Sequence, residues 1–270
     1  MTALVHHFRY EFRTGLRDAT LLLMNYLFPL GFYAMMGLVM VQINPGFKEA
    51  MIPAMVVLAA MASALLGLPG PLVESREAGI YRSYRINGVP AVSILLMPAL
   101  TTGFHILIVS GIIALTANPL FGGVVPANWG SFALVTLLTV FSFAGLGCLI
   151  GVVAHDARAV VLLSQLIFLP STLLGGMMMP LDILPQTVRP VSLLLPASHA
   201  MQAFHGFAYG LETVTNPLLS ALALGASGLI ALALAIYLFN WDSRNDVRRG
   251  HPLMALLALA PYVVVIVAQL

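Results

Sequence analysis

Long uncharged runs fill most of the chain, and short segments between them hold nearly all of its charged residues. Charged side chains are costly in hydrocarbon, so an uncharged run of about 18–20 residues or more predicts a helix that crosses the ~30 Å apolar layer of a membrane. The pattern predicts seven spans: Thr20–Ile43, Ala50–Val73, Ala91–Ala117, Trp129–Ala154, Ala159–Leu181 with its helix ending near Met178, Asn216–Asn240 and Pro252–Leu270.

Two uncharged stretches cannot be assigned by length alone. The stretch Ile86–His155 is 70 residues long, so the turn-forming residues between Asn118-Pro119 and Asn128 are expected to divide it into two spans. The stretch Pro190–Leu211 contains two prolines and several polar residues. We expect it to form short, broken helices at the membrane surface or dipping part-way into it.

The positions of Arg and Lys predict which side of the membrane each connection faces, because cytoplasmic loops carry an excess of positive charge. Two of these residues, Lys48 and Arg189, fall on one side and ten on the other. The N-terminus is therefore expected in the cytoplasm, and the end of the seventh span outside a bacterial inner membrane. The ten are Arg9, Arg13, Arg17, Arg76, Arg82, Arg85, Arg158, Arg244, Arg248 and Arg249.

Composition agrees with a lipid environment, since 60% of the residues are hydrophobic and 8% are charged, against roughly 25% charged in soluble domains. The net charge of +2 offers no electrostatic footprint for nucleic acid. Cys148 is the only cysteine, which excludes an internal disulfide, and no Cys/His cluster suits a metal. The first twenty residues are too polar for a cleavable signal peptide, so the run from Leu21 is expected to stay as an anchor.

The N-terminal residues 4–16 show a helical pattern with two faces. Leu4, Phe8, Phe12 and Leu16 form an apolar row, while Arg9, Arg13 and Arg17 form a basic one. This pattern favours an amphipathic helix lying in the cytoplasmic interface of the membrane. The alternative is a solvated lead-in to the first span.

The longest polar cytoplasmic segment, Glu74–Val89, reads ESREAGIYRSYRINGV. It mixes two Glu with three Arg and places Tyr81 and Tyr84 between them. A short helix with exposed charge and aromatic anchors suits docking onto a soluble partner. A solvated connector whose Arg residues only set the topology fits the composition equally well.

These segments together resemble the membrane subunits of ABC exporters of the ABC-2 type. The similarity lies in the order of the motifs: an interfacial helix before span 1, Glu77-Ala78-Gly79 with Arg82 and Arg85 after span 2, and Gly88-Val89-Pro90 opening span 3. A Pro-rich segment follows span 5, with Met179-Pro180 to Pro185 and then Leu195-Pro196-Ala197-Ser198-His199-Ala200. The similarity covers about residues 1–245.

The resemblance implies a fold: an all-α membrane protein, with a six-span permease bundle, an N-terminal interfacial helix and an external re-entrant hairpin at about Met179–Tyr209. Residues 1–19, 20–245 and 246–270 would be the interfacial helix, the permease domain and an extra C-terminal helix. The family usually ends after span 6, so a seventh span departs from it.

The resemblance also implies partners and roles. Two ABC ATPase subunits would bind the ATP and Mg²⁺, and a second permease copy or a paralogue would share the substrate path with spans 1, 2 and 5. The interfacial helix, with Phe8, Arg9, Phe12 and Arg13, would lean on the ATPase. The residues that would contact the ATPase directly are Glu74, Arg76, Glu77, Gly79, Tyr81, Arg82, Tyr84 and Arg85.

The chain has no phosphate-binding loop of its own, because its only lysine, Lys48, does not follow such a glycine pattern. We therefore expect no cofactor in this chain and no catalysis, with energy supplied by a partner or an ion gradient. A gradient-driven transporter would need buried acidic groups, but His105 is the one titratable candidate in mid-membrane apart from Tyr and Cys148.

An intramembrane hydrolase is the third possibility, since Gly225-Ala226-Ser227-Gly228 resembles the nucleophile motif of rhomboid-type proteases. A serine nucleophile needs a nearby base, and the only later histidine, His251, is expected far away at the cytoplasmic side. A small-residue packing surface is favoured instead.

The path itself lacks charge, so the expected cargo is amphipathic or apolar: a lipid, drug or hydrophobic natural product. Gln165 in span 5 could face a cavity, and Met177, Met178 and Met179 could form an adaptable apolar surface after a break at Gly175-Gly176. A lipid-facing helix end explains the three methionines equally well.

Overall fold

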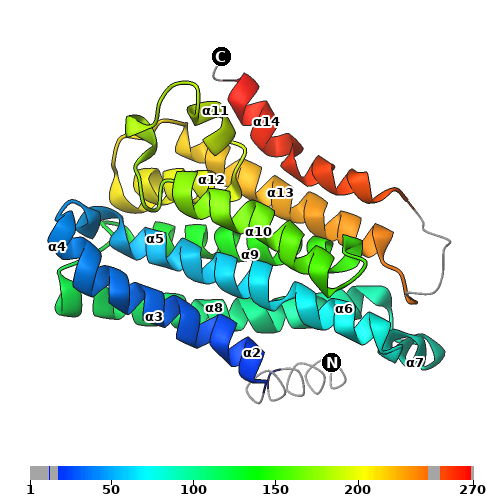
Figure 1. Cartoon of the computed structure of the whole chain (residues 1–270). Helices are drawn as coiled ribbons and strands as arrows, with labels where there is room; N and C mark the ends of the chain where they lie inside the picture. The colour runs from blue at the N-terminus through cyan, green and yellow to red at the C-terminus, as the bar shows by residue number, and fades with distance from the viewer. Residues whose placement is uncertain (1–11, 13–17, 243–249, 269–270) are drawn as a thin grey trace.

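The computed structural model describes residues 12, 18–242 and 250–268, which form helices and turns with no strand among them. The helices run roughly alongside one another (Figure 1). This confirms an all-α membrane fold, and each of the first six predicted spans corresponds to one long apolar helix. The six are Ala19–Ile43, Phe47–Glu77, Ala91–Phe121, Trp129–Val153, Ala157–Leu174 and Pro217–Leu238.

Spans 1 and 2 are not uniform α-helices, because turns of π-helix interrupt them. Span 1 consists of α2 (Ala19–Leu22), α3 (Phe28–Met35) and α4 (Val41–Ile43), separated by π turns at Leu23–Leu27 and Met36–Met40. Span 2 consists of α5 (Phe47–Met61), a π turn at Ala62–Gly67 and α6 (Pro69–Glu77). The later spans are α8 (Ala91–Phe121), α9 (Trp129–Val153), α10 (Ala157–Leu174) and α13 (Pro217–Leu238).

Three predicted helix ends are wrong by about a turn. Span 2 continues past Val73 to Glu77, because charge marks the edge of the hydrocarbon and not the end of a helix. Helix α8 passes through Pro119 and ends at Phe121, where Gly122 adopts a φ of 70°. The amides of Gly122 and Gly123 then donate to the carbonyls of Asn118 and Ala117, which closes the helix.

The third correction concerns span 5, which was expected to end near Met178. Helix α10 ends at Leu174, with Gly175 as its cap and Gly176 at a φ of 82°. A break at these glycines was expected and is confirmed. It leaves all three methionines outside the helix, in the connection that follows.

Burial divides the spans into a centre and two outer members. The most apolar stretch of span 2 is 94% buried and that of α9 is 72% buried, whereas those of span 1 and α10 are each 22% buried. Phe28 of span 1 and Phe168 of α10 pack with their rings 6.2 Å apart. The two most exposed spans are therefore neighbours, and their outward apolar faces are available to lipid or to another protein.

The centre is built on close approaches between backbones at glycine. A Cβ atom on Gly145 of α9 would lie 2.6 Å from the carbonyl oxygen of Gly228 in α13, and one on Gly147 would overlap the carbonyl oxygen of Ala64. Gly228 in turn faces the Cα atom of Ser142 at 2.8 Å from its own Cβ position. The expected packing role of Gly225-Ala226-Ser227-Gly228 is thereby confirmed.

After α10 the chain forms a series of short, broken helices, as expected. They are a 3₁₀ turn at Leu181–Ile183, α11 (Arg189–Ser192), α12 (Pro196–Ala203) and a π turn at Phe204–Ala208. Every residue of α12 is buried. Nε2 of His199 donates to the carbonyl of Leu193 at 2.8 Å, and Oε1 of Gln202 accepts from the amides of Val214 and Thr215. Burial against protein explains how irregular backbone is tolerated here.

The C-terminal segment packs along α13 in the opposite direction. It consists of a 3₁₀ helix at Pro252–Leu259 and α14 (Ala260–Val267) (Figure 1). The Ser227 hydroxyl donates to the Ala258 carbonyl at 2.8 Å, and the Tyr262 ring stacks on His199 at 4.8 Å. With a rise of ~2.0 Å per residue in the 3₁₀ part and ~1.5 Å in α14, the segment extends about 28 Å.

That length is close to the thickness of a bilayer core, so a seventh crossing stays a prediction. We expect His251→Cys to react with a membrane-impermeant maleimide from the same side as Arg85→Cys, and Ala268→Cys from the same side as Glu212→Cys. Native Cys148 is buried and gives a silent background. Labelling of His251→Cys and Ala268→Cys from one side would contradict a crossing.

The central packing gives a second prediction. Gly147→Ala should lower the free energy of unfolding by about 1–3 kcal/mol, because a methyl group there overlaps backbone that cannot rotate away. Gly111→Ala in α8 is the matched control, since no atom lies within 4 Å of its Cβ position. It should leave stability unchanged or raise it by up to about 1 kcal/mol. Unfolding in mixed micelles measures both, and equal effects would refute the packing argument.

Candidate functional site

The polar segment after span 2 forms a compact helical hairpin at one end of the bundle, here called the α7 end. Helix α6 ends at Glu77, Gly79 adopts a φ of 73°, and α7 (Ile80–Ile86) follows. A second left-handed glycine, Gly88 at a φ of 74°, leads into α8. Only glycine adopts this conformation without strain, so the two glycines fix the direction of α7.

This hairpin carries exposed charge of both signs. Glu74, Glu77, Arg82 and Arg85 are exposed, and Ile86 beside them is 85% exposed. A mixed-charge surface with a protruding apolar side chain suits recognition of a soluble protein. We call these five residues the α7 surface.

Tyr81 points the other way. It is 4% exposed, and its ring packs 5.4 Å from Phe239 and 6.4 Å from Tyr84, which is half-buried. Sequence reasoning treated both tyrosines as anchors for a partner. In the structure Tyr81 anchors α7 to the bundle itself.

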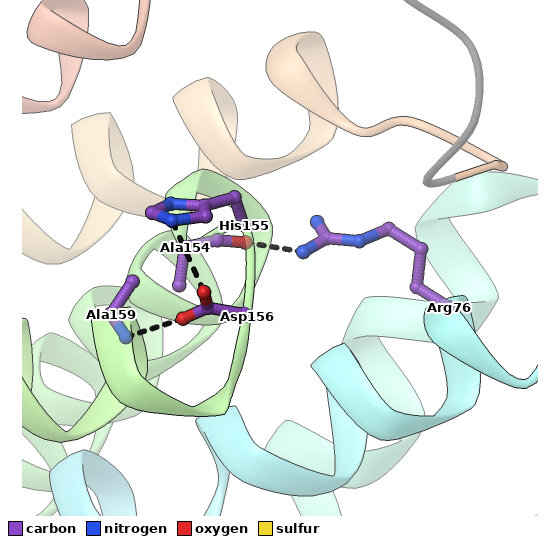
Figure 2. Close-up of polar contacts among 5 residues, drawn as sticks. All are labelled: Arg76, Ala154, His155, Asp156 and Ala159. Carbon is purple, nitrogen blue, oxygen red and sulfur yellow. Dashed lines mark hydrogen bonds and ion pairs between the residues drawn. The ribbon is translucent and has the colours of Figure 1, made fainter.

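Arg76 also points into the bundle and is 7% exposed. Its guanidinium donates to the carbonyl of Val152 at 2.9 Å and to that of Ala154, as Figure 2 shows for Ala154. A weaker contact reaches Gly151 at 3.5 Å. These carbonyls end helix α9 and have no partner within the helix, so a cation there satisfies them and complements the helix dipole.

The turn after α9 is held by a second charged group. Asp156 accepts a hydrogen bond from the amide of Ala159 at 2.8 Å, capping α10, and pairs with His155 at 3.2 Å (Figure 2). The amide hydrogen bond, helped by His155 and Arg158, lowers the pKa of this carboxyl below its ordinary value. The carboxylate therefore stays charged at neutral pH as a helix cap.

An ion pair connects α7 to the end of span 6. Nε of Arg82 lies 3.1 Å from a carboxylate oxygen of Asp242, with side chains 47% and 25% exposed. Partly exposed ion pairs contribute little to the free energy of unfolding. This contact therefore mainly fixes the direction of α7.

Of the expected interfacial helix, the structure describes Phe12 alone; Phe8, Arg9 and Arg13 lie outside the described residues. The Phe12 ring stacks on His105 with centroids 4.9 Å apart and packs edge-on against Phe104 at 5.6 Å. This residue of the N-terminal segment therefore contacts span 3. The sequence pattern carried no sign of that contact.

The four residues suggested for a substrate path are not alike. Gln165 is half-buried in α10, and its buried Oε1 atom has no hydrogen-bond partner in the structure. Met177 is 1% exposed and belongs to the core, whereas Met178 is half-buried and Met179 is 44% exposed. Three consecutive methionines thus differ in surroundings because they lie in a turn.

Ser227 does not have the surroundings of a nucleophile. Its hydroxyl donates to the Ala258 carbonyl, which cannot take up a proton. His251 lies at the other end of the C-terminal segment, where its Nδ1 accepts from the amide of Leu253. Ser227 has a structural role in fastening that segment to α13.

Comparison of the sequence with known protein families identifies the family of this chain. The family model described as "ABC-2 type transporter" matches residues 2–209, which include the α7 surface, Arg76 and the broken helices after α10. The chain belongs to the ABC-2 type transporter family. This confirms the resemblance inferred from motif order. It also confirms the prediction that the chain is a multi-pass membrane protein.

Named relatives agree with this family. The chain is 25% identical over 160 residues to the inner membrane transport permease YhhJ of Escherichia coli (strain K12), covering 58% of this chain and 43% of that protein. It is 24% identical over 198 residues to YvfS of Bacillus subtilis (strain 168), a protein named as a transport permease, covering 70% and 78% respectively. The chain thus spans less than half the length of YhhJ.

The buried position of Arg76 gives a testable prediction. Arg76→Leu should lower the free energy of unfolding by roughly 1.5–3 kcal/mol, because the α9 carbonyls lose a charged donor. Arg85→Leu, an exposed arginine in the same segment, should change it by about 0.5 kcal/mol or less. Denaturant titration of both variants in micelles tests this. A loss at Arg85 that matches the loss at Arg76 would count against the cap.

Proposed function

We propose that this chain is the permease subunit of an ATP-driven exporter in a bacterial inner membrane. It moves an amphipathic or apolar compound outward, with its N-terminus and its α7 end in the cytoplasm. Two ABC ATPase subunits bind ATP and Mg²⁺ and supply the energy, and a second permease copy or paralogue completes the path.

The observation that carries the proposal is the α7 surface and its attachment. Its charges face outward, while Tyr81 and Arg76 connect the same segment to Phe239 and to the end of α9. A partner that moves α7 therefore also moves the ends of spans 4 and 6. This is the behaviour required of a segment that transmits ATPase closure to the membrane.

Two further features support the proposal. Spans 1 and 5 lie side by side with large exposed apolar faces, which suits a second permease copy. Among the described residues, Arg76 is the only buried charged side chain, and it sits at the α7 end. The absence of other buried charge in that part of the chain fits an apolar route and offers no acidic relay for an ion gradient.

The coupling surface is tested by charge reversal. Glu77→Arg with Arg85→Glu should reduce co-purification of the ATPase and ATP-dependent export at least about tenfold, since like charges then face one another across the contact. Arg85 is chosen over Arg82 because Arg82 already pairs with Asp242.

The matched control reverses two charges at the opposite end, Lys48→Glu with Glu212→Arg, and should leave co-purification intact. Export is followed with a hydrophobic dye in inside-out vesicles. Unchanged assembly and export in the first variant would refute the assignment of this surface. Failure of any ABC ATPase to co-purify with the unaltered chain would refute the proposed function as a whole.

A further inference from the structure

A small cavity lined by both polar and apolar side chains lies near the α7 end, and none of the five residues of the α7 surface lines it. Its volume is about 110 Å³. Spans 1, 2 and 3 and helix α7 all contribute to its wall, which includes Asn25, Ser75, Tyr81, Tyr84, Thr102 and His105. So many polar side chains around one cavity are unusual in a chain with 8% charged and 60% hydrophobic residues.

Two of these side chains are buried without satisfied polar atoms. Asn25 is 3% exposed and His105 is 2% exposed. Oδ1 of Asn25 and Nε2 of His105 have no hydrogen-bond partner in the structure. A buried polar atom is normally paired, and an unpaired one is costly, so both atoms point to a partner that binds in the cavity.

The chemistry of that partner follows from the two groups. Nδ1 of His105 lies 2.6 Å from the Tyr26 hydroxyl, so the ring orientation is fixed and only Nε2 remains for a ligand. Nε2 of His105 donates or accepts depending on the tautomer, and the unpaired Asn25 atom accepts if it is the oxygen or donates if the amide is turned over. A neutral hydroxyl or amide group both donates and accepts, and therefore satisfies the pair in either arrangement.

The surroundings argue against a charged ligand and for an attached hydrocarbon chain. Among the residues that the structure describes, no Asp, Glu, Lys or Arg lines the cavity. Tyr26, whose hydroxyl meets His105, also lines an apolar groove on the outer face of span 1 with Leu22, Leu23, Leu27 and Leu30. Tyr26 does not itself line the cavity, so its contact with His105 places the apolar groove next to the cavity wall.

We propose that this cavity binds the neutral, hydrogen-bonding headgroup of an amphipathic molecule, with Asn25 and His105 as its recognition residues and the chain lying in the span 1 groove. The proposal rests on the proposed function in taking this molecule as the cargo. Tyr81 and Tyr84 lie in the same cavity wall, so an occupied site contacts the segment that would receive the ATPase movement.

Direct binding tests the site without the ATPase. The probes are radiolabelled oleamide, methyl oleate and oleate, which share one chain and differ in the headgroup. Oleamide donates and accepts, methyl oleate only accepts, and oleate is charged. The full chain in nanodiscs should bind oleamide saturably and at least about tenfold more tightly than the other two, as expected for one discriminating buried hydrogen bond.

Variants locate the site. Asn25→Leu and His105→Phe should each weaken oleamide binding about tenfold, toward the affinity of methyl oleate; the phenyl ring preserves the stack with Phe12. His105→Gln restores a hydrogen-bonding group and should recover most of the affinity, which also covers the case in which the first two variants fold poorly. Ser164→Ala is the matched control and should leave oleamide binding unchanged, since it removes an unpartnered buried polar atom that does not line the cavity.

Three outcomes overturn the proposal: no saturable oleamide binding, which leaves water as the occupant; equal affinity for all three headgroups; or unchanged oleamide binding in folded Asn25→Leu and His105→Phe. These outcomes are distinct from failure of the proposed function, which is decided by ATPase co-purification. If the chain binds oleamide through Asn25 and His105 but associates with no ATPase, the binding site is supported and the exporter function is refuted.

Discussion

Close contact between backbones around α9 is the constraint on which the rest of the structure depends. Lipid tails are as apolar as the side chains, so helices in a membrane associate mainly through van der Waals contact and hydrogen bonds. Gly145, Gly147 and Gly228 remove the side chains that would separate α9 from spans 2 and 6. The three helices form one unit, and spans 1 and 5 attach to it with most of their surface left outward.

The α7 end of the molecule is attached directly to this centre. Arg76 closes the end of α9 from within the hairpin that carries the α7 surface, and Tyr81 packs on the residue that follows α13. Because these contacts attach the segment directly, a movement of α7 is passed to the ends of α9 and α13. The proposed exporter would require such an attachment, and here it consists of hydrogen bonds to carbonyls that the helix itself leaves unpaired.

Much of the fold could be predicted from the sequence, because charge and hydrocarbon exclude one another. Six spans, the broken helices after span 5 and the break at Gly175-Gly176 followed from this rule and from glycine chemistry. Helix ends were less accurate, since Glu74–Glu77 and Pro119 continue helices that a hydropathy pattern would stop. The residues around the site were harder still. Arg76 reads in sequence as one more basic residue of a loop, and only tertiary contacts reveal that it faces inward.

The π turn at Leu23–Leu27 carries a consequence of its own. Such a turn holds about one more residue than the corresponding α turn, so it displaces everything beyond it by roughly 100° around the helix axis. Asn25 lies in this turn and is buried, while Leu23 and Leu27 on either side of it are 40% and 67% exposed. Leu23 and Leu27 therefore meet lipid while Asn25 turns inward, and the surplus residue sets how these two faces continue along the rest of span 1. Loss of that residue during evolution would rotate the part of span 1 beyond Leu27 by roughly 100° relative to the part before Leu23. The apolar composition of the span would hardly change, yet different side chains would face the bundle and the lipid.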